Sequence, residues 1–398
     1  MKIRLAALFA VLALSLPVAG CWDRHELQER SFVMAAAIDV AGAAKEKESG
    51  AANVEDFPLL EGRRKYRLSL QILELAPPPK GQTREAKSAK TFVIATDGDS
   101  LFQMIEDLQG QADRQLYFEH IQSIIISEAA IREGLEPIID WFHRDAELRW
   151  RTKVFITPGR AADILNYKPP SGEAGGMYLA KSAEMYFKDP FIAGSHTDLG
   201  YVTERFDQHA SLVIPRLDYK PPVLKMGGMA VFKNGRFAGY LDGYATQGGK
   251  FLMGIEKSAL IVAPCPNHPA YPVTFELFRH DTRLTPHIDG DSIYFTCDIY
   301  MMGNLGENQC DGMGDDTSDP AYIRKLEAAF AQEVKKNILY ARQAYWQLGL
   351  SPPGFQSRLK AHAPATWEKV KDRWDNIFPT IPLILSVNVT IRNLGTHK

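Results

Sequence analysis

The sequence around Cys21 predicts that its thiol is modified by lipid. Two small residues, Ala19 and Gly20, precede it in the order Val-Ala-Gly-Cys. A lipoprotein peptidase needs small side chains at its cleavage subsites, and only a thiol can take the diacylglyceryl thioether. We therefore expect Cys21 to be the mature N-terminus, as an N-palmitoyl, S-diacylglycerol cysteine. The alternative is a plain signal peptide that precedes a free or disulfide-bonded Cys21.

The segment before Cys21 has the layout of a secretory signal. Lys2 and Arg4 give a positive start, and the apolar run Leu5–Leu16 follows. This run is too short to span a bilayer comfortably, so we assign residues 1–20 to a lipoprotein signal peptide. Each methylene buried in lipid contributes roughly 0.8 kcal/mol, so two or three acyl chains anchor a protein stably where one is marginal. We expect the mature body to be lipid-anchored at the outer face of a membrane.

Three further cysteines, Cys265, Cys297 and Cys310, are an odd set for an oxidising compartment. They allow at most one disulfide and leave one thiol over, and the sequence does not say which pair forms. A zinc site would use these three cysteines together with His268, but only the sequence Cys265-Pro-Asn-His268 has the spacing of metal ligands. Structural cysteines are the preferred interpretation. Cys297 is expected in a core, because it alternates with apolar residues of a strand at 292–301.

Motifs that carry catalysis are missing from the chain. It contains no Gly-x-Ser-x-Gly elbow, phosphate loop, dinucleotide fingerprint or His-Glu-x-x-His helix. The acidic segment 311–319 is similar to a calcium loop but lacks the alternating ligands and the closing glutamate. Carboxylates far apart in sequence can still form an acid and base pair in a fold. We predict a protein that is not an enzyme, with no catalytic, cofactor or metal site.

The composition is that of a packed globular chain, with 45% hydrophobic and 24% charged residues. Lys and Arg number 46 and Asp and Glu 48, so the formal charge of −2 gives no strong field toward nucleic acid. The basic run Arg63–Arg67 leads into an alternating segment and is interpreted as the solvated start of a strand. No apolar run after residue 21 approaches the ~18 residues of a membrane-spanning helix. Any ion-conducting pore would therefore come from a partner.

Strands and helices alternate in the first half of the mature chain. Expected strands cover 32–40, 67–75, 91–95, 121–127 and 153–157, and expected helices begin at Ser100, Glu128 and Ala161. Ser100 and Gln103 have the pattern of a capping box, and Gly134 and Pro137 break the second helix. This alternation predicts a sheet covered by helices. Between 167 and 222, prolines and glycines predict linkers around short elements.

The second half is predicted to hold a hairpin, a long helix and a closing strand. Asn234-Gly235 joins two apolar runs and is a strong hairpin signal. Asp319-Pro320 begins a helix whose apolar residues, from Ile323 to Tyr345, step by three or four. Residues 384–391 alternate as a strand.

These elements predict an α+β fold of successive mixed sheet-and-helix domains. We expect an N-terminal α+β domain at 21–200, with strand and helix alternation, and a linker region at 201–222. A C-terminal α+β region at 223–395 would hold a sheet with one long helix. A split of this region into two subdomains near 265–290 is open.

Several stretches together resemble one family, the C-subunit lipoproteins of spore germinant receptors (the Ger(x)C type). The matching stretches are Gly20-Cys21-Trp22-Asp23 with Glu26-Leu27, Ile38-Asp39, Phe118-x-His120, 124–127, Arg160–Leu165, Gly228–Phe232 with Gly235, Gly239-x-Leu241, the long helix to Gln343, Trp367, Trp374, Phe378 and 387–395. The Cys-Trp-Asp start is the most specific of them. The chain departs from the family pattern at Trp346–Pro353, where the family has an Asp and a Gly-Phe-Gly-like turn.

The resemblance implies a non-enzymatic subunit on the outer face of the spore inner membrane. It implies two integral-membrane partners, the A-type and B-type receptor subunits, one of which recognises nutrient germinants. Tethering would raise the effective concentration of the chain near these partners. A solute-binding lipoprotein of a transporter is the main alternative and needs a ligand cleft between two lobes. An anchored cell-wall hydrolase is a further alternative, which needs paired carboxylates with raised pKa in a groove.

Overall fold

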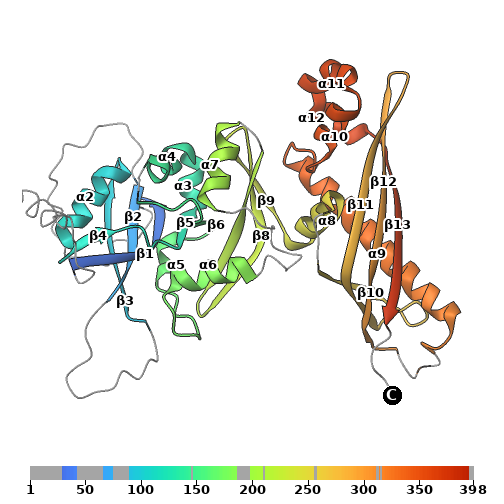
Figure 1. Cartoon of the computed structure of the whole chain (residues 1–398), viewed down its shortest axis with the longest axis horizontal. Coiled ribbons are helices and arrows are strands. Elements are labelled where there is room, and N and C mark those ends of the chain that lie inside the picture. Colours follow the sequence, from blue (N-terminus) through green and yellow to red (C-terminus); the bar gives the residue numbers. More distant parts are fainter. Residues whose placement is uncertain are drawn as a thin grey trace, which may run out of the picture.

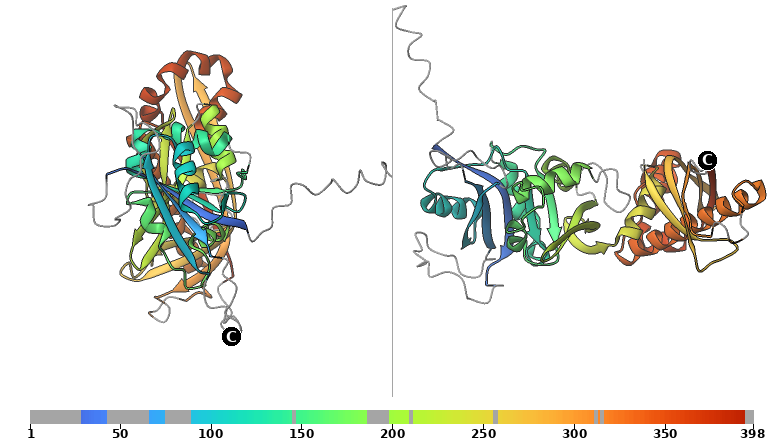
Figure 2. Two further views of the ribbon diagram at one scale, coloured as in Figure 1. Left: turned by 90° about the vertical axis from the view of Figure 1, so that its left-hand side faces the viewer. Right: turned by 90° about the horizontal axis from the view of Figure 1, so that it is seen from below.

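Two β-sheets organise the chain, and helices cover them (Figure 1). The computed structural model describes residues 29–42, 66–74, 89–144, 147–185, 198–208, 211–254, 258–310, 313 and 316–393. When the molecule is turned, the two sheet-and-helix units lie one after the other along its length (Figure 2). The predicted α+β class is confirmed.

The first sheet has nine strands, in the order β3-β2-β1-β5-β6-β7-β8-β9, with β4 beside β1. The strands are β1 (Arg30–Val40), β2 (Tyr66–Leu73), β3 (Thr91–Gly98), β4 (Gln115–Tyr117), β5 (Ser123–Ser127), β6 (Lys153–Thr157), β7 (Leu212–Lys220), β8 (Val223–Lys233) and β9 (Arg236–Leu241). β1, β5 and β6 run parallel. Both faces of these three strands are covered, which is why their sequences are continuous apolar runs.

Helices pack on both faces of the first sheet. They are α2 (Leu101–Gln111), α3 (Glu128–Glu133), α4 (Glu136–Arg144), α5 (Ala161–Leu165), α6 (Gly175–Met185) and α7 (Leu199–Asp207). α2, α3, α4 and α7 share one core, to which Leu108, Ile131 and Phe142 contribute buried side chains. α5 and α6 share a second core through Ile164 and Leu179. The expected sheet covered by helices is therefore present.

Two predictions about helix ends had different outcomes. Gly134 follows α3 with a φ of 132°, and α4 begins at Glu136, so the expected break is confirmed. Ser100 precedes α2, but its side chain makes no capping hydrogen bond, so the predicted capping box is wrong. Ser100 is exposed, and water can satisfy the free amides of the first turn in its place.

Residues 199–241 complete the first sheet. The segment 201–222, expected as a linker, instead contains most of α7 and all of β7, which pairs with β6 and β8. Pro221 and Pro222 form the turn between β7 and β8, where no ladder amide is needed. The prolines therefore mark a hairpin and not a boundary between domains.

The second sheet has four strands, in the order β10-β11-β12-β13. They are β10 (Ala259–Pro264), β11 (Pro272–Asp289), β12 (Ser292–Asn308) and β13 (Leu383–Asn393). β11 pairs with β12 from Val273 to Asp289, so one strand crosses the region where a subdomain split was an option. Phe295, Cys297 and Ile299 are buried on one face of β12, as predicted.

The long helix α9 (Pro320–Gln347) covers the second sheet. Asp319 begins it as predicted, since its side chain accepts a hydrogen bond from the Ala321 amide at 2.8 Å. The remaining helices are α8 (Gly243–Met253), α10 (Phe355–His362), α11 (Pro364–Val370), η4 (Lys371–Arg373), α12 (Trp374–Ile377) and η5 (Phe378–Thr380). Among the described residues no helix combines the length and the apolar character needed to cross a membrane.

Candidate functional site

Cys21 lies outside the described residues, so its lipidation stays a prediction. The described chain begins at Glu29, and Arg30 opens β1 nine residues after Cys21. The start of β1 is therefore only nine residues along the chain from the predicted anchor.

Of the stretch Phe118-x-His120, only His120 belongs to the cluster of rings at the start of β1, because the Phe118 ring packs on Trp141 with centroids 5.6 Å apart. The Phe32 ring lies 5.0 Å from the His120 ring and 5.7 Å from the Tyr117 ring, measured between centroids. The guanidinium carbon of Arg30 lies 4.0 Å from the Tyr117 centroid. These contacts fix the first residues of β1 against the segment that leads into β5.

Asp39 connects two further stretches that resemble the family. It lies in β1, and its carboxylate accepts hydrogen bonds from the amides of Ala161 at 2.8 Å and Ala162 at 2.9 Å. Burial raises the pKa of Asp39, against the lowering effect of these two hydrogen bonds. The carboxylate therefore fixes the start of α5 on the sheet, and its chemistry is structural.

The hairpin of β8 and β9 confirms the predicted turn, with φ of 50° and 74° at Asn234-Gly235. Gly228 has a φ of 75°, and a Cβ there would lie 2.4 Å from the carbonyl oxygen of Leu241. Gly239 has a φ of 146°, and a Cβ there would lie 2.6 Å from a methyl carbon of Leu348. At Gly228 the backbone conformation and the close approach of a carbonyl both exclude a side chain, and at Gly239 the backbone conformation favours glycine.

The hairpin meets the C-terminal half in one apolar cluster, which we call the joint. Buried residues of β8, β9, α8 and α9 build it, together with one from the loop after α9. They are Met229, Val231, Leu241, Ala245, Tyr345 and Leu350. The two sheet-and-helix units are therefore connected by packed side chains as well as by the chain itself.

Glycines let α8 approach α9 closely beside the joint. A Cβ on Gly248 would lie 2.5 Å from the Asn337 carbonyl oxygen, and one on Gly249 would lie 3.1 Å from the Tyr345 hydroxyl. The Asn337 side chain donates to the Tyr244 carbonyl at 3.0 Å. A larger residue at Gly248 would overlap the backbone of α9, and one at Gly249 would require the Tyr345 side chain to shift by a few tenths of an ångström.

Two tyrosine and carboxylate pairs tie α8 and the residue before it to α9. The Tyr340 hydroxyl donates to Asp242 at 2.6 Å, and this hydrogen bond raises the pKa of Tyr340. The Tyr244 hydroxyl donates to Glu333 at 2.7 Å, and burial followed by this hydrogen bond raises the pKa of Tyr244. Both hydroxyls are held protonated as donors, which suits a structural role.

Cys265 and Cys310 form a disulfide with an Sγ–Sγ distance of 2.02 Å. Cys297 is free and buried, as expected, and burial raises its pKa to about 12. The disulfide uses two of the thiols that the zinc alternative needs, so that alternative is wrong. The pairing itself was not predicted from the sequence.

The acidic segment 311–319 lies partly outside the described residues. Asp316 accepts hydrogen bonds from the amide and the hydroxyl of Ser318, both at 2.7 Å, and Asp319 caps α9. These two carboxylates are engaged locally. Across the described ranges, no three His, Cys, Asp or Glu side chains are grouped so that they could hold a metal ion.

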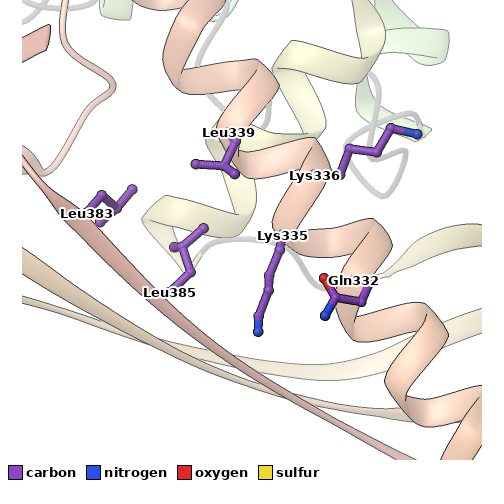
Figure 3. A pocket seen from close by; sticks show the side chains of 6 residues that line it. All are labelled: Gln332, Lys335, Lys336, Leu339, Leu383 and Leu385. Carbon is purple, nitrogen blue, oxygen red and sulfur yellow. The ribbon is translucent and has the colours of Figure 1, made fainter.

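Two pockets open on the C-terminal half. The first, of about 400 Å³, lies between α9 and β13, where Leu339 faces Leu383 and Leu385 beside Lys335 and Lys336 (Figure 3). The second, of about 240 Å³, lies between α8, α9 and β10. Residues 244–385 alone line the two pockets, so neither is a cleft between two lobes. Their lining includes no Ser, Cys or His side chain that would serve as nucleophile or base.

Two family models match the chain in succession. The model described as "Spore germination protein N-terminal domain" matches residues 23–219, and "Spore germination B3/ GerAC like, C-terminal" matches residues 227–395. The chain belongs to this spore germination family. The resemblance to the Ger(x)C type is therefore confirmed.

Relatives of this chain match over nearly their whole length. Spore germination protein YndF of Bacillus subtilis (strain 168) is 26% identical, over 100% of this chain and 98% of the relative. Spore germination protein B3 of the same organism is 22% identical, over 96% of each chain. The crystal structure of the GerBC protein matches with a TM-score of 0.58 and 19% identity, over 83% of this chain and 94% of that one. The last comparison shows that the fold is shared.

The segment 346–353, in which this chain departs from the family pattern, begins in the last turn of α9 with the exposed Trp346 and continues into a loop that contacts the hairpin. Lys233, at the hairpin turn, donates to the Gly349 carbonyl at 2.5 Å and pairs with Asp375 at 2.6 Å. Leu348 and Leu350 join the apolar cluster of the joint. Residues 348–350 of this segment therefore contribute to the contact between the two units.

Sequence reasoning missed α8 and its contacts. Gly243, Gly248 and Gly249 lower the helix propensity of this segment, so it has no clear helical pattern. The available signal was Asp242, whose side chain caps the helix by accepting from the Ala245 amide at 2.7 Å. Packing against α9 outweighs the low propensity.

Proposed function

We propose that this chain is a lipid-anchored, non-enzymatic subunit of a spore germinant receptor. Cys21 carries the acyl groups and holds the body on the outer face of the spore inner membrane. Its partners are two integral-membrane subunits of the A and B type. The chain supports assembly of the receptor and nutrient-triggered germination.

The observation that carries this proposal is the match of both spore germination models over residues 23–219 and 227–395. Relatives named for spore germination align over nearly the whole chain, which supports a role for the complete molecule and not for one part. The Val-Ala-Gly-Cys sequence before Trp22 supports the anchor.

The joint supports a coupling role within such a receptor. Its core takes side chains from both units, and packed cores respond to displacement as a body because they contain little free volume. A partner that moves the hairpin of β8 and β9 would therefore also shift α8 and α9. The proposed mechanism is assembly and mechanical coupling, with no bond made or broken.

The proposal is tested in spores that lack the chain and are complemented with the wild type or with Cys21→Ala. We expect wild-type chain to restore the response to the cognate nutrient, and Cys21→Ala to restore it weakly or not at all. As the control, the spore coat is removed chemically and the wall is opened by enzyme. All strains should then be equally viable, because this treatment bypasses nutrient germination. Normal nutrient germination without the chain would contradict the proposal.

A further inference from the structure

The start of β1 shares one edge of the first sheet with the segments that precede β5 and β6. The parallel register pairs Ala35 with Ser123 and Ser123 with Lys153. Residues just before these strands therefore emerge at the same edge, which we call the amino edge. β1 and β4 lie on the side of the first sheet remote from the second sheet (Figure 1).

Side-chain contacts connect the first residue of β1 to the turn before β6. Arg30 lies over the ring of Tyr117, and Tyr117 is hydrogen-bonded to Glu119. Glu119 in turn pairs with Arg149 at 3.6 Å. The turn Arg149–Arg151 is thus a near neighbour of Arg30.

Trp150 is the apolar tip of this turn. Its side chain is 61% exposed, although one edge rests on the backbone of Gly200, where a Cβ would lie 3.0 Å from the indole. The His143 ring supports it with centroids 5.6 Å apart. Arg149 and Arg151 on either side are exposed. The turn therefore presents a held indole between two guanidinium groups.

The length of the connecting chain limits how far this turn can lie from the anchor. Cys21 and Arg30 are nine residues apart. Even a fully extended chain of that length spans only about 30 Å. The amino edge is therefore kept close to whatever surface holds Cys21.

We propose that the turn Arg149–Arg151 binds the phospholipid surface that holds the acylated Cys21. The Trp150 indole lies at the level of the headgroups, which is the depth that tryptophan prefers in membranes. Arg151 attracts phosphate groups, and Arg149 does so less because Glu119 offsets its charge. This second contact orients the body on the membrane, which an acyl anchor at a single point does not do. The inference rests on the lipid anchor of the proposed function.

The test is quenching of tryptophan fluorescence by brominated lipid in vesicles of phosphatidylcholine and phosphatidylglycerol. The full lipidated chain is reconstituted in a Trp22→Phe background, because the indole beside the anchor would be quenched by anchoring alone. Trp150→Phe is compared with Trp346→Phe, which removes another exposed indole, in the last turn of α9. We expect Trp150→Phe to lose most of the quenching and Trp346→Phe to keep it.

Charge reversal gives an independent readout in the same vesicles. Arg151→Glu is expected to reduce the quenching, and Arg358→Glu, at an exposed site on α10, is expected to leave it unchanged. Vesicles of phosphatidylcholine alone should show weaker quenching for the parent chain.

Failure of this inference can be distinguished from failure of the anchor by flotation. A chain that floats with the vesicles but whose quenching is unchanged by Trp150→Phe would overturn the membrane contact alone. A chain that does not float with vesicles would overturn the anchor and the contact together.

Discussion

At the scale of single residues, the burial of Asp39 could be predicted from the sequence, but its hydrogen-bond partners could not. Its burial follows from its place in the apolar run of β1, which was predicted as a strand over 32–40. Its partners could not be predicted, because Ala161 lies 122 residues further along the chain. The cysteines are a similar case, since a count of three limits the pairing but does not choose it.

The first prediction concerns Asp39→Asn. Because the pKa of Asp39 is raised in the folded state, the folded chain binds more protons than the unfolded chain above pH ~3.8. The contribution of this carboxyl group to stability is thus fully present below the pKa of the unfolded state and is lost as pH rises through the folded pKa. We expect the stability of wild type relative to Asp39→Asn to be greatest in acid and to fall toward neutral pH.

Thermal unfolding of both proteins across this pH range measures the effect. Asp163→Asn, which removes an exposed carboxylate from the same helix, is the matched control for effects of acid shared by all variants. A stability difference that grows as pH rises would contradict the raised pKa of Asp39 in the folded chain.

The cysteines give the second prediction. The double variant Cys265→Ser and Cys310→Ser is expected to lower the free energy of unfolding by about 2–4 kcal/mol, because the disulfide restricts the unfolded chain. In the wild type, Cys297 should resist thiol reagents until the chain unfolds, since it is buried with a pKa of about 12. Mass spectrometry after labelling counts the thiols. Rapid labelling of Cys297 in the folded, oxidised chain would contradict its assignment as a buried free thiol.

At the scale of elements, periodicity predicted structure best where one face alone is buried. The stripe on α9 and the alternation on β12 were recognised for that reason. β7 and α8 were not, because their sequences contain proline or glycine that local rules assign to linkers. In both cases a neighbouring element supplies the stabilisation: β8 pairs with β7, and α9 packs on α8.

The third prediction compares alanine at two helical glycines. Gly248→Ala is expected to lower the free energy of unfolding by about 1–3 kcal/mol, because its Cβ would lie against the backbone of α9. Gly110→Ala, at an exposed site on α2 with nothing within 4 Å, is expected to raise it by up to about 1 kcal/mol. Denaturant unfolding of both variants measures the contrast. Equal effects at the two sites would contradict the close packing of α8 on α9.

At the scale of the whole molecule, the predicted fold class is confirmed, but the units divide at a different place from the expected domains. The first sheet continues through β9 to Leu241, beyond the end of the N-terminal family model at residue 219. The hairpin of β8 and β9 thus matches the C-terminal model while it completes the N-terminal sheet. The sequence alone could not show that the hairpin completes the N-terminal sheet, because strand pairing and the joint depend on contacts between residues distant in sequence.

We propose above that the chain works as an anchored subunit beside two integral-membrane proteins. The most direct measurement is mass spectrometry of what copurifies with the detergent-extracted chain from sporulating cells. Wild type is compared with Cys21→Ala and with an unrelated protein fused after residue 28. We predict that wild type recovers two polytopic membrane proteins, Cys21→Ala recovers less of both, and the fusion recovers neither. Recovery of transporter components, or of no membrane protein, would contradict the account.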